Sequence, residues 1–147
     1  MTYTFWKSVL DRTTATVALI LLSPLLACVA AAIAWLDGWP VLFTQQRAGQ
    51  HGRPFRIYKF RTLRLGLHDP TRPGDHLTRT GGFLRRWALD ELPQLWNIVR
   101  GEMSWVGPRP TLCEQVEAYD AFQRQRLRVK PGLTGWAQIH GRNALPW

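Results

Sequence analysis

The sequence has few acidic residues and few cysteines, and it lacks the common nucleotide-binding motifs. Ten Asp and Glu residues face 19 Lys and Arg residues, so the formal charge is +9 over 147 residues. With two cysteines, no disulfide framework is implied and a reducing compartment is expected. The signatures of P-loop NTPases (Walker A), dinucleotide enzymes (Gly-x-Gly-x-x-Gly) and serine hydrolases (Gly-x-Ser-x-Gly) are all missing.

The positive charge predicts an anionic partner. Nucleic acid, an anionic lipid surface and a phosphorylated substrate all fit this charge. The sequence contains no recognisable helix-turn-helix, RNA-recognition or zinc pattern, and its four histidines show no metal-ligand spacing. We therefore expect lipid or phosphate ligands and no nucleic acid.

One stretch has no charged side chain at all. Thr13 to Leu36 comprises 24 uncharged residues, enough for a helix to cross about 30 Å of hydrocarbon. Trp6, Trp35 and Trp39 flank this stretch, and Trp prefers the boundary between lipid and water. A signal peptide, a spanning helix and a re-entrant helix that returns to the same side all begin with such a segment.

The surrounding residues favour the two membrane interpretations over a signal peptide. The run is long for a signal peptide, and Pro24 interrupts its middle. Proline frees a carbonyl that needs a partner in hydrocarbon, which the hydroxyl of Ser23 can supply. Basic residues on both flanks, Lys7 and Arg12 before and five between 47 and 61 after, would both stay cytoplasmic only in a re-entrant helix. From the residues alone, spanning and re-entrant helices remain open.

The rest of the chain predicts a small α+β domain. Residues 41–46 and 54–60 alternate as strands around a glycine-containing turn, which indicates a β-hairpin. Helices are expected at 83–86, at 90–100 with Asp90 as N-cap, and from the capping-box pattern at Thr111 toward residue 130. We expect the whole chain to be mostly helical.

Asp90 and Glu91 are the only adjacent carboxylates in the chain. A helix cap followed by a first-turn acid explains such a pair in structural terms alone. The structural interpretation is the commoner one for such a pair. A catalytic pair also explains it, because an ionised Asp can attack phosphorus and a neighbouring Glu can hold Mg²⁺ together with substrate phosphates. The pair by itself does not separate these interpretations.

Three other segments offer phosphate or nucleotide ligands. Arg109 is fixed between Pro108 and Pro110, which suits bidentate phosphate binding. Lys59 and Arg61 are two apart on an extended segment and so share one face. The segment from Lys130 to Gln138 combines glycines, an aromatic ring and an amide that can hold a nucleotide base. A stiff solvated loop and a basic lipid-facing edge are the structural alternatives.

Together, these segments resemble the monotopic polyprenyl-phosphate phosphoglycosyl transferases, the bacterial sugar transferase family. The resemblance rests on five blocks in order, namely Ser23-Pro24, residues 57–61 (IYKFR), residues 89–95 (LDELPQL), residues 106–110 (VGPRP) and residues 131–143 (PGLTGWAQIHGRN). It implies transfer of a sugar-1-phosphate from a UDP-sugar to undecaprenyl phosphate, which starts exopolysaccharide, O-antigen or glycoprotein glycan assembly.

The resemblance also assigns roles to residues. Asp90 is expected to attack the sugar-bearing phosphate and release UMP, and the lipid phosphate then takes the sugar phosphate from Asp90. Glu91, with Asp90 beside it, is expected to hold Mg²⁺. Arg109 is the main candidate for binding phosphate. Further candidates for substrate or phosphate binding are Lys59, Arg61, Arg86, Gln138 and Arg142.

The family's topology resolves the open choice in favour of the re-entrant helix. It implies a membrane helix-break-helix over residues 1–38, broken at Ser23-Pro24, and a catalytic domain over residues 39–147 on the cytoplasmic face of the bacterial inner membrane. A homodimer is a further expectation. The chain departs from the family at Trp87-Ala88 and stops at Trp147, where relatives continue. The alternatives are a shortened inactive relative and a membrane-anchored basic module that binds anionic lipid or nucleic acid without catalysis.

Overall fold

The computed structural model describes residues 2–66 and 76–140. Its helices are α1 (Thr2–Leu36), α2 (Gly81–Arg86), α3 (Leu95–Val99), α4 (Cys113–Glu117) and α5 (Trp136–Ile139), with 3-10 helices η1 (Gln50–Gly52), η2 (Leu89–Gln94) and η3 (Gln123–Arg128). Its strands are β1 (Leu42–Ala48), β2 (Pro54–Phe60), β3 (Ser104–Val106) and β4 (Gly132–Thr134). The expected mostly helical α+β composition with a small sheet is confirmed.

The predicted hairpin is present. β1 and β2 pair antiparallel, from Leu42 opposite Phe60 to Ala48 opposite Pro54. Gly52 has a positive φ of 76° in the connecting turn, a conformation that costs glycine little. A second pair, β3 with β4, is parallel and was not predicted, because three-residue strands carry too little alternation to be recognised.

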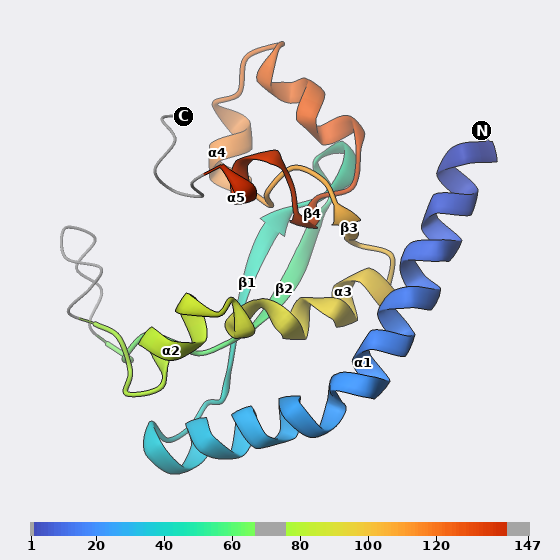
Figure 1. The fold of residues 1–147 in the computed structure, drawn as a ribbon. Coiled ribbons are helices and arrows are strands. Elements are labelled where there is room, and N and C mark those ends of the chain that lie inside the picture. Colours follow the sequence, from blue (N-terminus) through green and yellow to red (C-terminus); the bar gives the residue numbers. More distant parts are fainter. Residues whose placement is uncertain (1, 67–75, 141–147) are drawn as a thin grey trace.

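α1 is the longest element, and it is bent rather than broken. It runs as a helix through Pro24 and changes direction about midway (Figure 1). Proline cannot donate the bond to the carbonyl four residues back, so the carbonyl of Ile20 loses its helical partner. The Ser23 hydroxyl donates to that carbonyl at 2.7 Å, as expected. The predicted helix-break-helix is therefore one helix with a bend that satisfies its own backbone.

The hydrogen bond from the Ser23 hydroxyl to the Ile20 carbonyl should contribute measurably to stability. Ser23→Ala is expected to lower the free energy of unfolding by about 0.5–1.5 kcal/mol, because it leaves the Ile20 carbonyl unpaired. Thr16→Ala is the matched control, since the Thr16 hydroxyl bonds a carbonyl in a stretch of helix without proline. Thermal unfolding in detergent measures both. In a Pro24→Ala background, which restores the backbone donor, the Ser23 effect should shrink; an undiminished effect would contradict this explanation.

Both arms of α1 pack against the rest of the chain. Ala15 in the first arm joins a buried cluster with residues of β2 and α3, and Ile33 in the second arm joins another with Val41, Phe60 and Leu84. Within the described residues, α1 is the one helix long and apolar enough to cross a membrane, and only 6% of its most apolar window is buried. α1 therefore contacts the body at both ends and leaves a large apolar surface uncovered.

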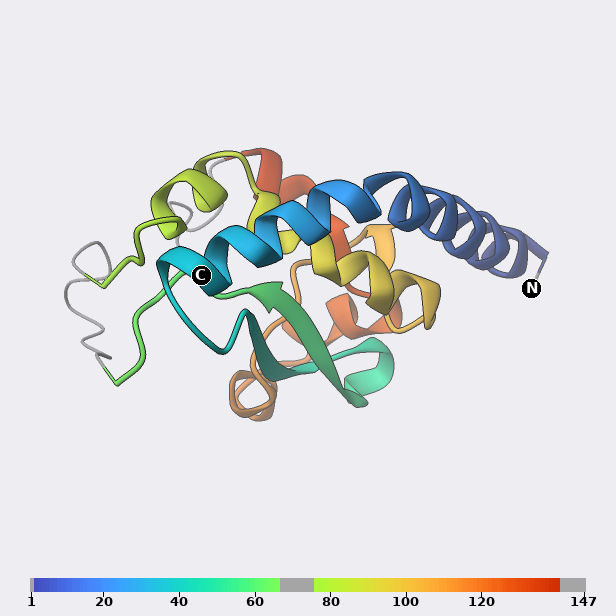
Figure 2. The same cartoon turned by 90° about the horizontal axis from the view of Figure 1, so that it is seen from below.

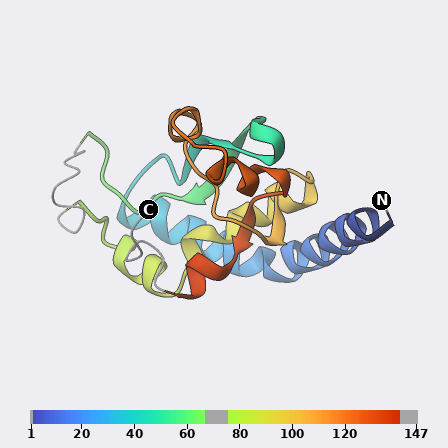
Figure 3. The same cartoon turned by 90° about the horizontal axis from the view of Figure 1, so that it is seen from above.

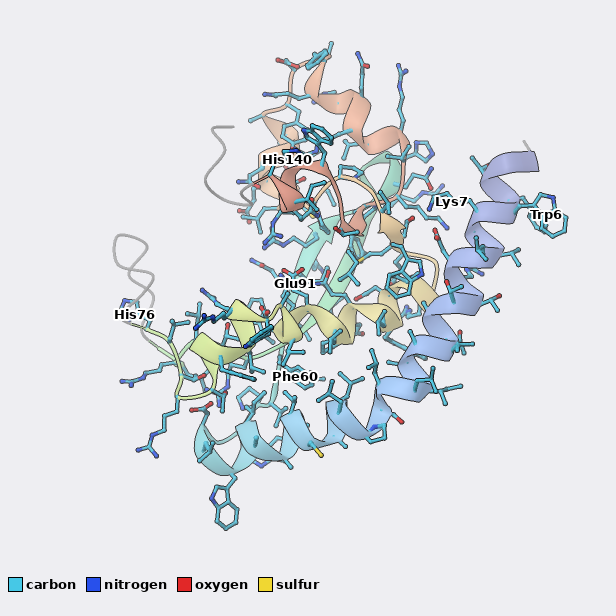
Figure 4. All side chains as sticks on the ribbon, viewed as in Figure 1. Trp6, Lys7, Phe60, His76, Glu91 and His140 are labelled. Carbon is cyan, nitrogen blue, oxygen red and sulfur yellow. The ribbon has the colours of Figure 1, made fainter. Side chains whose placement is uncertain are left out.

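Polar contacts fix the first arm of α1. Asp11, which is 8% exposed, accepts hydrogen bonds from Lys7 and from the hydroxyl of Ser104, both at 2.7 Å. The indole of Trp105 donates to Thr14 at 2.8 Å. Lys7 points toward the body and Trp6 away from it (Figure 4). These contacts join the N-terminal arm to β3.

The elements form three levels. The second arm of α1 crosses one face of the body (Figure 2), and the C-terminal elements, α4 to α5, lie on the opposite side (Figure 3). The hairpin, η2 and α3 lie between them (Figure 1). This middle level has one side toward the apolar helix and one side toward the C-terminal elements.

The prediction of one long helix after Pro110 is wrong. α4 ends at Glu117 and the separate helix η3 begins at Gln123. Thr111 does not cap a helix, because its backbone pairs with Ala48. Asp120 and Gln123 exchange side-chain to backbone hydrogen bonds of 2.7 and 3.1 Å, a reciprocal cap that starts a new helical segment.

Candidate active site

Close backbone contact brings two distant motifs together. Gly107 and Gly132 lie so close that a Cβ on either would collide with the opposing backbone, and a Cβ on Gly135 would collide with the Gly107 carbonyl. Hydrogen bonds from Gly107 N to Thr134 O (3.0 Å) and from Gly132 N to Pro108 O (2.9 Å) join the segments. The loop that carries Arg109 is thereby held next to the segment that carries Gln138.

A left-handed residue places the acid pair. Ala88 has φ 55°, an uncommon conformation for a residue with a side chain, and its carbonyl accepts the backbone N–H of Glu91 at 3.2 Å. η2 begins after it, with Asp90 and Glu91 in its first turn and no side-chain cap. The prediction that Asp90 caps a helix over 90–100 is wrong, because Ala88 takes the cap position and a 3-10 helix precedes α3.

Glu91 is the centre of an ion-pair group. Its Oε1 accepts from the Lys59 ammonium at 2.8 Å and lies 3.7 Å from the Arg109 guanidinium. Lys59 and Glu91 are about four-fifths buried, with side-chain exposures of 19% and 21%. The three side chains come from β2, η2 and the loop after β3, so folding joins the predicted residues into one group. Glu91 lies on the side of η2 and α3 that faces the C-terminal elements (Figure 4).

Burial is the main influence on the charge of Asp90. Burial raises the pKa of Asp90 above its ordinary 3.8, and the charge of Glu91 raises it further, while Lys59 and Arg85 lower it by less. The ionised carboxylate is thus poorly solvated and lies beside cations. Such a carboxylate is more basic than an exposed one, which suits a nucleophile.

A narrow polar pocket is lined by Glu91, whereas Asp90 is not among its lining residues. Its volume is about 20 Å³, room for about one water molecule. Its polar lining is Arg47, Lys59, Glu91, Gln94, Arg109 and Gln138. We call these six residues the polar pocket. Lys59 in β2 lines it, whereas Tyr58 and Phe60 line an apolar groove against α1, because neighbouring residues in a strand point to opposite sides.

Two predicted phosphate ligands lie outside the polar pocket. Arg61 is 6% exposed and donates to the carbonyls of Asp37 (2.7 Å), Gly38 (2.6 Å) and Pro40 (2.6 Å), so it holds the chain that leaves α1. Arg86 is exposed in α2 and does not line the pocket. Arg142 lies outside the described residues.

Three residues of the site were not predicted from the sequence. Arg47 and Gln94 line the polar pocket, and Arg85 acts on the pKa of Asp90 and donates to Thr62 at 2.9 Å. The hairpin register contained the signal for Arg47, since it pairs with Phe55 on the face that also carries Lys59. Gln94 follows Glu91 by three residues, a helical spacing that predicts a shared side.

The donor set suits Mg²⁺ only together with a phosphate. Among residues 2–66 and 76–140, no group of three acidic, His or Cys side chains could hold a metal ion. Mg²⁺ is usually held by one or two carboxylates plus substrate phosphates and water, which Asp90 and Glu91 can supply. Both cations that pair with Glu91 approach its Oε1. The acid pair therefore fits the ion in a complex with substrate.

Comparison with known proteins supports the resemblance to the bacterial sugar transferase family. The profile of the bacterial sugar transferase family matches residues 2–147. The chain is 43% identical to the uncharacterized sugar transferase EpsL of Bacillus subtilis (strain 168), over 96% of the chain and 71% of that protein. It is 39% identical to the exopolysaccharide production protein ExoY of Rhizobium meliloti (strain 1021), over 93% of the chain and 70% of that protein.

Longer relatives carry more specific names. The chain is 42% identical to the UDP-glucose:undecaprenyl-phosphate glucose-1-phosphate transferase of Escherichia coli (strain K12), over 89% of the chain. It spans 30% of that protein's length. These relatives are named as transferases of a sugar phosphate to undecaprenyl phosphate, which is the class of enzyme expected from the sequence.

Proposed function

Because the chain belongs to the bacterial sugar transferase family, we propose that it transfers a sugar-1-phosphate from a UDP-sugar to a polyprenyl phosphate such as undecaprenyl phosphate. The observation that carries this proposal is the position of Asp90. Burial disfavours its ionised carboxylate, and the charges of Glu91 and Lys59 act on it. Both of these residues line the polar pocket, which holds three cations. A nucleophile next to a phosphate-binding pocket is what this transfer requires.

In the first step, a carboxylate oxygen of Asp90 attacks the phosphorus that bears the sugar. An Asp–O–P bond forms, the bond from that phosphorus to the bridging oxygen breaks, and UMP leaves with the bridging oxygen. Lys59 and Arg109 stabilise the charge on the phosphate oxygens, as fixed cations do in phosphoryl transfer. Glu91 holds both cations in position through its ion pairs.

In the second step, the phosphate oxygen of the lipid attacks the same phosphorus. The Asp–O–P bond breaks, Asp90 is restored, and the product is a polyprenyl diphosphate sugar. No oxidant or further reactant is needed. The same cations serve both steps, because the oxygens of the same phosphate group carry the negative charge in each step.

Mg²⁺ is proposed as the cofactor, held by Glu91 and Asp90 together with the diphosphate. When bound, it neutralises charge on the phosphate oxygens and favours departure of UMP. Within the chain itself, the cationic side of the polar pocket already provides part of this neutralisation.

The packing of α1 supports a re-entrant helix, and we propose that it lies at the cytoplasmic face of the bacterial inner membrane. A straight span would carry one end of α1 away from the body, but both arms pack on the body here. We expect Trp6→Cys and Arg53→Cys, each in a Cys28→Ser, Cys113→Ser background, to react with an impermeant maleimide from the same side. Labelling of intact spheroplasts and of inverted vesicles measures this. Labelling from opposite sides would show a span.

The activity itself is tested by UMP release. Detergent-solubilised protein is incubated with Mg²⁺, undecaprenyl phosphate and a panel of UDP-sugars, and UMP is quantified. We expect release with at least one sugar and none from Asp90→Asn. No UMP from any sugar with the wild-type chain would contradict the proposal and favour a non-catalytic module.

A further inference from the structure

The polar pocket contains buried polar atoms without partners. In the described part of the chain, five buried side-chain nitrogen or oxygen atoms lack a hydrogen bond. Four of them belong to residues that line this pocket, namely Arg47 Nε, Gln94 Nε2 and both amide atoms of Gln138. Gln94 is only 2% exposed. Buried polar groups are nearly always paired, so these atoms point to a polar partner. The pocket of about 20 Å³ takes a water molecule as it stands, and it must widen to take a phosphate.

Arg47 is a half-buried cation that forms no ion pair with an acid among residues 2–66 and 76–140. Its terminal nitrogens donate to neutral oxygens, the Pro110 carbonyl at 3.3 Å and the Gln45 amide at 2.7 Å. Burial lowers the pKa of Arg47, and the nearby charge of Arg109 lowers it further. A guanidinium in such surroundings is stabilised by an anion, and phosphate matches its planar fork of donors.

The cations of the site follow one another in space, from Asp90 outward. Lys59 acts on Asp90 and pairs with Glu91, Arg109 lies near Glu91, and Arg47 lies near Arg109. Arg47 sits four residues from Lys59 by the hairpin register, toward the turn of the hairpin. Two cations, Arg109 and Arg47, thus extend the pocket away from the nucleophile.

We propose that Arg47 binds the phosphate of the leaving nucleotide, with the amide of Gln94 donating a hydrogen bond to the same diphosphate. This inference rests on the proposed function, and it separates the two phosphates of the donor. The sugar-bearing phosphate lies at Asp90 and Lys59. The nucleotide phosphate lies between Arg109 and Arg47, and it leaves with UMP after the first step.

Binding of UMP tests the assignment of Arg47. We expect Arg47→Met to bind UMP roughly 10- to 100-fold more weakly than wild type in calorimetry, because a charge-assisted bidentate contact is lost. Arg53→Met is the matched control. It removes the same charge from an exposed residue of the hairpin that does not line the pocket, and its UMP affinity should be unchanged.

The two half-reactions separate a ligand from a structural residue. Protein loaded with sugar phosphate to completion and freed of nucleotide should transfer its load to undecaprenyl phosphate at the same rate in Arg47→Met and wild type, because UMP has already left. Adduct formation should be slowed. Equal slowing of both half-reactions, or unchanged UMP affinity, would overturn the inference. A different result would contradict only the proposed function. In that case wild-type protein binds UMP, Arg47→Met weakens this binding, and no adduct forms in either protein.

Gln94 gives a second readout. Gln94→Leu keeps a similar volume and removes a buried amide nitrogen that has no partner. We expect the melting temperature of the unliganded protein to stay or rise, while the stabilisation by added UMP falls. A structural amide would behave in the opposite way, so a lower melting temperature without UMP contradicts the role proposed for Gln94.

Discussion

Asp90→Asn is expected to abolish turnover, by at least about 10⁴-fold, while leaving the protein as stable as wild type or more stable. Asparagine keeps the shape of the side chain but cannot form the Asp–O–P bond, so the covalent route is closed. The stability expectation follows from the environment of Asp90. Its charged form is disfavoured by burial and by Glu91, and the neutral amide avoids both costs.

The stability gain should depend on pH in a defined direction. The pKa of Asp90 is higher in the folded protein than its ordinary 3.8. The folded state therefore holds the proton more tightly, and the stability of wild type falls as pH rises from the ordinary pKa through the raised one. The difference in melting temperature between Asp90→Asn and wild type should be fully present at neutral pH and disappear below about pH 4.

Differential scanning fluorimetry across this pH range measures the effect. Asp90→Glu is a useful companion variant, because it retains the charge but moves the carboxylate. At neutral pH, its melting temperature should stay below that of Asp90→Asn. A melting temperature of Asp90→Asn well below that of wild type at neutral pH would contradict the account, since it would show that the Asp90 charge stabilises the fold.

Glu91→Gln is expected to lower turnover by about 10²–10³-fold and, unlike Asp90→Asn, to destabilise the protein by about 1–2 kcal/mol. The amide cannot neutralise Lys59 and Arg109, which contact the same carboxylate oxygen. Three cations of the polar pocket would then face one another without that acid. Weaker binding of Mg²⁺ adds to the loss of activity, under the role proposed for Glu91.

Chemical denaturation and UMP release measure the two effects of Glu91→Gln. Glu117→Gln is the matched control, because it removes one negative charge from an exposed residue of α4 outside the polar pocket. Its stability and activity should be close to wild type. If Glu91→Gln and Asp90→Asn both lowered the stability, the inference that the two acids lie in contrasting environments would be wrong.

Local patterns predicted much of the fold. Alternation in residues 41–46 and 54–60 identified the hairpin, and the Ser23-Pro24 pair identified both the bend of α1 and the hydroxyl that satisfies it. These features depend on neighbours in the sequence. The interruption between α4 and η3 was missed because the helical spacing of apolar residues continues across it, while the reciprocal bonds of Asp120 and Gln123 override it.

The site was predictable where residues act as motifs and less so where they act through packing. Glu91, Lys59, Arg109 and Gln138 meet in the polar pocket as the motifs suggested. Arg61 was predicted beside Lys59 because alternate residues share a face, but β2 ends at Phe60 and Arg61 turns toward the carbonyls that follow α1. Arg47 required the hairpin register, which no residue pattern fixes alone.

A covalent sugar phosphate on Asp90 can be detected in the intact mass of the protein after exposure to UDP-sugar. Wild-type protein is incubated with Mg²⁺ and the UDP-sugar that supports UMP release, without a lipid acceptor. We expect a mass gain of one sugar phosphate, located on Asp90 by peptide mapping, absent from Asp90→Asn and cleared by adding undecaprenyl phosphate. Turnover to polyprenyl diphosphate sugar without such a gain, or a gain that persists in Asp90→Asn, would contradict the covalent route.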